Sequence, residues 1–191
     1  MSRRWKRTST STSLKWRRRE RAIVIVLGID PGTAATGYGV VSDHSGEPRG
    51  SLSLVECGVI RTAPRDPLSV RLSGLYDEVR AIIVRHRPDA LAIEDVFYAK
   101  NVRTTVVLGH ARGVVLLAAQ QSGMVITEYP PATIKKTVVG AGAATKEQVQ
   151  FMVARLLRLK HAPEPHDAAD GVAAALAHLL TARVPRLERV R

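Results

Sequence analysis

The feature that most constrains the fold is a run of apolar, largely β-branched residues at positions 22–29, AIVIVLGI, which ends at Asp30. The run is short and nearly continuous, and valine and isoleucine favour strands over helices. A strand without polar alternation is typical of a sheet that is covered on both faces. We therefore expect the ordered part of the chain to begin near residue 22, with a buried central strand.

The residues that follow predict a mixed sheet with helices on its faces. Strands expected at residues 38–44 and 51–62 are joined to the first strand by short turns, which predicts an antiparallel meander. Apolar spacings of three and four then indicate a helix from Leu68 that ends before Pro88. Further strands are expected at residues 89–94 and 124–129, and further helices at residues 103–121, 130–140, 145–159 and 166–184. This order predicts an α/β fold in which a five-stranded mixed sheet is flanked by helices, within one domain of residues 22–183.

Positive charge is distributed unevenly along the chain. The net charge of +12 points to a polyanionic partner, either nucleic acid or an anionic membrane surface. Residues 1–21 hold nine Lys or Arg and one acid, so the rest of the chain carries only +4. We interpret this segment as a disordered basic arm that adds non-specific DNA affinity, and residues 184–191 as a short basic tail. No uninterrupted apolar run approaches the roughly 18 residues of a membrane helix, so no membrane partner is expected.

A single cysteine, Cys57, excludes an internal disulfide and a cysteine-rich zinc site. Its apolar neighbours suggest a small filler at a buried strand position. One cysteine fits a reducing compartment, and we expect a cytoplasmic protein.

Four carboxylates carry the chemical signal. Asp30 and Glu94 each stand at the end of a predicted central strand, where side chains face the ligand crevice of an α/β sheet. Two acids in one crevice repel each other unless a cation lies between them, and their hard oxygens suit magnesium or manganese. Asp167 and Asp170 share one face at the start of the last helix, where acids alone would indicate simple capping. Together the four predict a two-metal site for phosphodiester cleavage.

Four glycines in residues 28–39, GIDPGTAATGYG, are a second signal. Gly32 frees the turn after Asp30, whereas Gly37 and Gly39 allow another backbone to approach closely. Taken alone, this segment also resembles the phosphate loop of actin-like ATPases and sugar kinases.

Six motifs that follow one another along the chain favour a different family by resemblance. They are VLGIDPGTAATGYGVV (26–41), CGVIRT (57–62), LAIEDVFYAKN (91–101), LGHARG (108–113), TIKKTVVGAGAATKEQVQFMV (133–153) and HDAADGVAAALAH (166–178). The chain resembles the RuvC family of Holliday-junction resolvases, or crossover junction endodeoxyribonucleases, over nearly all of its predicted ordered part.

The resemblance implies an RNase H-like homodimer that cuts two opposed strands of a four-way DNA junction. It further implies two Mg²⁺ ions per active site, with Mn²⁺ possible, and a branch-migration motor complex of the RuvA and RuvB type as partner. The family positions that match are the acids Asp30, Glu94, Asp167 and Asp170, the active-site lysines Lys135 and Lys146, the base-stacking aromatic Phe97, and the DNA-contact candidates Lys100, Asn101, Arg103 and Arg112.

Two features of the chain depart from the family pattern: a histidine beside the third acid, and the N-terminal arm. Some members carry a histidine at the third catalytic position, and His166 directly precedes Asp167 here. The three-residue spacing to Asp170 assigns that role to Asp167, with His166 as a loop neighbour. The N-terminal arm has no family counterpart.

The alternatives to a junction resolvase are a non-catalytic junction-binding protein, an actin-like or sugar-kinase-type ATPase fold, and a related nuclease that acts on RNA.

Overall fold

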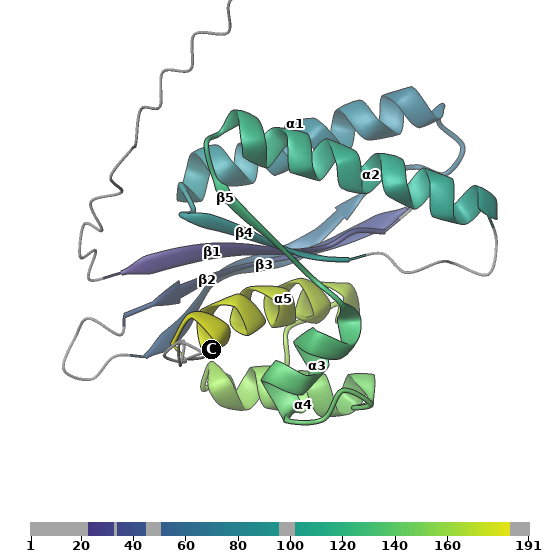
Figure 1. Ribbon diagram of the computed structural model, residues 1–191. Coiled ribbons are helices and arrows are strands. Elements are labelled where there is room, and N and C mark those ends of the chain that lie inside the picture. The colour runs from purple at the N-terminus through teal and green to yellow at the C-terminus, as the bar shows by residue number, and fades with distance from the viewer. Residues whose placement is uncertain (1–22, 33, 45–50, 96–101, 184–191) are drawn as a thin grey trace, which may run out of the picture.

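The computed structural model describes residues 23–32, 34–44, 51–95 and 102–183, so the arms expected at residues 1–21 and 184–191 lie outside the described residues (Figure 1). A central sheet separates two layers of helices. The strands are β1 (Val24–Asp30), β2 (Ala35–Asp43), β3 (Leu52–Arg61), β4 (Ala90–Glu94) and β5 (Val125–Tyr129). The helices are α1 (Leu68–His86), α2 (Val102–Gln121), α3 (Pro131–Val139), α4 (Lys146–Leu156) and α5 (His166–Arg183).

The sheet is five-stranded and mixed, in the order β3-β2-β1-β4-β5, which confirms the expected fold class. β1, β2 and β3 form the predicted antiparallel meander, while β4 and β5 run parallel to β1. The predicted start of the second strand at residue 38 was wrong, because β2 begins at Ala35. Gly37, which we placed in a turn, pairs directly with Asp30 across the β1–β2 ladder.

Both faces of β1 are buried, as its apolar run predicted. Leu27 and Ile29 face α1 and α2, whereas Val26 faces the layer of α3, α4 and α5 (Figure 1). All three side chains are fully buried. Side chains alternate along a strand, so successive residues of β1 belong to two different hydrophobic cores, one on each face of the sheet.

Local signals set the start of α4 and the end of α1. α4 starts at a capping box, in which Thr145 Oγ1 accepts from the Gln148 backbone N–H at 3.3 Å. The Gln148 side chain accepts from the Thr145 N–H at 2.9 Å. α1 ends at His86, and its C-cap residue Arg87 adopts the left-handed conformation with φ 47° before Pro88. α4 stops at Leu156, three residues earlier than expected, and Arg158 is left-handed just beyond it.

Two sequence expectations need correction. By length and composition, α2 is apolar enough to cross a membrane, contrary to the expectation that no segment approaches this threshold. In the fold its inner face packs with α1 against the sheet through Ala111, Val115 and Ala118. Cys57 does lie on a strand, β3, but it is only partly buried beside the core.

Candidate active site

Asp30 and Glu94 lie side by side because their strands are adjacent and parallel. Ile29 pairs with Ile93, so the next residue on each strand stands at the same level. Both carboxylates line a crevice of about 190 Å³ on the side of the sheet that carries α3, α4 and α5. The crevice also receives Asp170 from α5, together with the two predicted lysines, Lys135 and Lys146.

Glycines bring α5 close enough to the sheet to deliver its acids. A Cβ at Gly37 would lie 1.8 Å from the backbone oxygen of Asp167, and one at Gly39 would lie 2.6 Å from the Cα of Val172. The expectation that these two glycines admit another backbone is therefore confirmed. Gly28 and Gly171 serve the same contact from β1 and α5, and we did not assign them this role from sequence. Glycine inside a strand was the available signal, since it often marks a close backbone approach.

The crevice holds carboxylates whose ionised forms are unfavourable. Burial, with a further contribution from Asp170, raises the pKa of Asp30 to about 6. Burial, followed by repulsion from Asp30, raises the pKa of Glu94 to about 7. Lys146 opposes both shifts without cancelling them. Three carboxylates face two lysines in the crevice, so an added cation would stabilise the ionised acids.

Lys146 is the best-positioned cation of the crevice. It is the first residue of α4, so the capping box at Thr145 also fixes the start of the helix that presents it. Its Nζ donates to Asp170 Oδ2 at 3.0 Å, and this hydrogen bond raises the pKa of the lysine. Lys135, one turn into α3, also lines the crevice. The sequence placed both lysines near the acids only through the family resemblance.

The donor set fits hard divalent cations. Asp30, Glu94 and Asp170 offer only carboxylate oxygens, the ligands that Mg²⁺ and Mn²⁺ prefer. Within the described part of the chain, no three His, Cys, Asp or Glu side chains already form a closed metal-ligand group. One oxygen of Asp170 accepts a hydrogen bond from Lys146. The arrangement is a set of acids that a cation would draw together.

Asp167 lies slightly apart from the other acids. Its charge acts on Asp30, yet its side chain is not among those that line the crevice. The preceding His166 is exposed, and its Nδ1 lies 2.6 Å from Nε2 of Gln150 on α4. This hydrogen bond ties the beginning of α5 to α4.

The predicted DNA-contact residues divide into two groups. Phe97, Lys100 and Asn101 lie outside the described residues. Arg103 is exposed in the first turn of α2. Arg112 forms ion pairs with Glu128 and, at 3.4 Å, with Asp95, the residue that follows Glu94. In this arrangement Arg112 neutralises acids of the protein itself.

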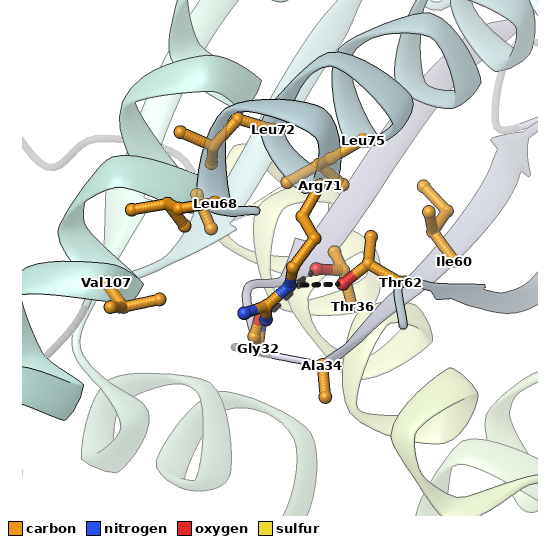
Figure 2. Close-up of a pocket in the computed structure, with 11 residues that line it drawn as sticks. Gly32, Ala34, Thr36, Ile60, Thr62, Leu68, Arg71, Leu72, Leu75 and Val107 are labelled. Atoms are coloured by element: carbon orange, nitrogen blue, oxygen red, sulfur yellow. Dashed lines mark hydrogen bonds between the residues drawn. The ribbon is translucent and has the colours of Figure 1, made fainter. Parts of the chain in front are cut away.

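A second cavity lies on the α1–α2 side of the turn that follows Asp30 (Figure 2). Its free volume of about 10 Å³ has room for about one water molecule. Arg71 extends into it from α1, and its Nε donates to Thr62 Oγ1 at 3.2 Å. The backbone N–H of Gly32 donates to Thr36 Oγ1 at 3.3 Å. The Gly32 contact closes the turn that follows Asp30, and the Arg71 contact joins α1 to the residue after β3, a role that we did not expect for Arg71.

Comparison with known proteins identifies the family. The family model described as "Crossover junction endodeoxyribonuclease RuvC" matches residues 26–178. The chain is 48% identical over 155 residues to the crossover junction endodeoxyribonuclease RuvC of Pelotomaculum thermopropionicum, covering 81% of this chain and 92% of that protein.

Solved structures give the same result. The Thermus thermophilus RuvC structure superimposes with a TM-score of 0.77 at 36% identity, over 84% of this chain and 96% of that one. The same protein in complex with a Holliday junction substrate gives a TM-score of 0.75 at 34% identity, with the same coverage. The expected RNase H-like fold is thereby confirmed. From its motifs, its sheet order and these similarities, the chain belongs to the RuvC family of crossover junction endodeoxyribonucleases.

Proposed function

We propose that this chain resolves four-way DNA junctions in recombination and repair, by metal-dependent hydrolysis of two opposed strands. The observation that carries the proposal is the crevice in which Asp30, Glu94 and Asp170 meet Lys135 and Lys146. Membership of a family of metal-dependent nucleases supports the same reading, as does the similarity to a relative bound to a Holliday junction. Neither the ATPase nor the non-catalytic alternative is favoured by these similarities.

We assign metal binding to Asp30, Glu94, Asp167 and Asp170, with two Mg²⁺ ions per site and Mn²⁺ as a possible substitute. When bound, such ions supply an activated water and charge stabilisation for the departing 3′ oxygen. The protein holds the acids at the ends of two adjacent strands and at the start of α5. This placement fixes where the scissile phosphate can lie.

The two lysines would orient the phosphate and offset the negative charge that builds up on it. Lys146 already carries its proton firmly, because Asp170 raises its pKa. Lys135 approaches from α3, so positive charge reaches the crevice from two elements. Phe97 would stack on an unpaired base, as the family resemblance implies. We propose Lys100, Asn101, Arg103 and Arg112 only as further contacts to the DNA backbone.

A homodimer is the second part of the proposal, and the outer face of α2 supports it. Val102, Val106 and Leu117 are 80%, 52% and 51% exposed on this helix. Gly109 and Gly113 lie between them, and a Cβ at either position would meet nothing within 4 Å. An apolar helical stripe with small residues at its centre suits close packing against a second copy. Two copies would present two active sites to the two opposed strands.

The cellular setting follows from the family resemblance. We propose a cytoplasmic enzyme that works with a branch-migration motor complex of the RuvA and RuvB type. Gel filtration with light scattering would test the dimer, using Val106→Lys on α2 as the disrupting variant. A monomeric wild-type chain, both free and bound to a junction, would contradict the dimer.

The decisive experiment compares a labelled four-way junction having a mobile core with a linear duplex of equal length. Paired symmetric nicks should appear on the junction alone, in Mg²⁺ or Mn²⁺ and not in chelator. Asp30→Asn should remove them, whereas Asp77→Asn on the exposed side of α1 is the matched control. Tight junction binding without cleavage by the wild-type chain in either metal would reject the nuclease.

A further inference from the structure

A groove on α4, next to the active-site crevice, has no part in the reaction described above. It has a volume of about 370 Å³, and its lining includes Phe151, Arg155, Lys160 and His161. Gln150 also lines it, and the same Gln150 bonds to His166 at the start of α5. The groove therefore begins directly beyond Lys146, because Glu147 also lines it.

The surface of this groove combines an exposed aromatic ring with a cation. Phe151 is 61% exposed, although phenylalanine usually lies in the core. The guanidinium of Arg155 lies over this ring, with its Cζ 5.8 Å from the ring centroid. This cation–π contact holds the arginine along the surface instead of leaving it free in solvent.

Positive charge predominates around the groove, where Arg155 and Lys160 outnumber the one acid in its lining. Residues 151–162 contain Arg155, Arg158 and Lys160 and no acid, although the chain beyond residue 21 is only mildly basic overall. Glu147, the acid that lines the groove, lies in the first turn of α4, where a hydrogen bond from Thr145 lowers its pKa. A basic surface with an exposed aromatic is complementary to the sugar–phosphate backbone of nucleic acid.

We propose that this groove binds the backbone of a duplex arm of the DNA junction, outside the cleavage site. The inference rests on the proposed function and adds a second contact area to it. Arg155 and Lys160 contact phosphates, and Phe151 packs against a deoxyribose. Arg155 lies about 14 Å from Lys146 along the axis of α4, which corresponds to about four base pairs. The contact is independent of base sequence, since phosphates position a protein without specifying bases.

The salt dependence of junction binding by the full chain in chelator tests this proposal. Each lost phosphate contact should reduce the magnitude of the slope of log affinity against log salt by about 0.9. Arg155→Gln with Lys160→Gln should therefore reduce it by about 1.8. Arg87→Gln, exposed at the far end of α1, removes one positive charge elsewhere and should leave the slope unchanged. Equal slopes for the double variant and the wild-type chain would overturn the proposal.

Neutral methylphosphonates placed singly along one arm locate the contact. The wild-type chain should lose affinity when the substituted phosphate lies about three to six base pairs from the cut. The double variant should be indifferent to those same substitutions. Sensitivity that persists in the double variant would assign the contact to another surface and overturn the proposal. Thermal melting verifies that each variant is folded.

These binding results are independent of catalysis. Absence of cleavage by the wild-type chain in Mg²⁺ and Mn²⁺ would reject the proposed nuclease, while the salt slope would still decide the role of the groove. Cleavage accompanied by an unaltered slope would reject the groove alone.

Discussion

Acids on opposite faces of the sheet have opposite surroundings. On the α1 face, Glu56 of β3 is surrounded by donors. Arg85 Nε donates to it at 3.1 Å, the Tyr38 hydroxyl at 2.7 Å, and His86 Nε2 lies at 2.8 Å. The hydrogen bond from Arg85 is the main reason that the pKa of Glu56 falls to about 2.

On the α5 face, the acids Asp30 and Glu94 have pKa values raised to about 6 and 7, mainly by burial. The difference shows which carboxylate has all its stabilising partners within the chain and which carboxylates need an added cation. Glu56 joins the end of α1 to an edge strand and needs nothing more. The crevice acids destabilise the metal-free protein, and a bound cation would repay that cost.

The largest effect is expected when the crevice acids are neutralised. Asp30→Asn with Glu94→Gln should reduce junction cleavage by about a thousandfold or more, since metal-ion catalysis supplies several kcal/mol. The same variant should melt about 5 °C higher than the wild-type chain in chelator at neutral pH, because it lacks the ionised pair. Cleavage rates and calorimetry check the two halves. A variant that is both inactive and less stable would break the comparison.

Gly37→Ala should damage the crevice and spare the Glu56 cluster. A Cβ at this position would collide with the Asp167 backbone, so α5 must shift at a cost of about 1–3 kcal/mol. We expect cleavage to fall about tenfold to a hundredfold as well. Gly74→Ala on α1, where a Cβ would meet nothing within 4 Å, is the matched control and should stabilise by about 0.5–1 kcal/mol. Wild-type cleavage by Gly37→Ala would show that the acids tolerate displacement.

Glu56→Gln should lower stability and leave cleavage unchanged. The lost charged hydrogen bonds are partly exposed, so we expect about 1–2 kcal/mol, seen as a lower midpoint in urea denaturation. Arg85→Gln should be milder, because Tyr38 and His86 would still contact Glu56. A marked loss of cleavage in Glu56→Gln would mean that the two faces are coupled.

The smallest expected effect is on the pH dependence of the melting temperature in chelator. This dependence should distinguish the crevice acids from Glu56. Asp30 and Glu94 have raised pKa values, so their penalty is present at pH 8 and fades as pH falls through about 7 and 6. Glu56 has a lowered pKa, so its contribution is complete above about 4.5 and is lost as pH falls toward 2. Asp30→Asn with Glu94→Gln should remove the change in melting temperature near pH 6 to 7. Glu56→Gln should remove the change below about pH 4.5. Identical profiles for all three proteins would contradict these assignments.

The sequence predicted most of the fold and the placement of two acids. Asp30 and Glu94 follow apolar strand runs, and strand ends in α/β sheets converge, so local pattern sufficed. The start of α4 was predicted at residue 145, because the capping signal of Thr145 lies within one turn. The start of β2 was missed, since Gly37 has turn-like chemistry but is paired with Asp30 in the ladder.

Contacts between distant segments could not be read from local pattern. Arg112 stays a proposed DNA contact, but local pattern gave no sign of its ion pairs with Asp95, just after β4, and with Glu128 of β5. Arg71 falls outside the apolar stripe of α1, but the turn after Asp30 lies within its reach (Figure 2). The Glu56 cluster likewise depends on the packing of α1 across β3.

The shared level of Asp30 and Glu94 on adjacent parallel strands limits how chain length can change in this protein. Inserting or deleting one residue within β1 would turn Asp30 toward α1 and α2, because side chains alternate between faces. The same change in the β3–α1 connection would move no acid. We therefore expect length variants of this chain that keep the enzyme working to have their insertions and deletions in such connections, and none inside β1 or β4.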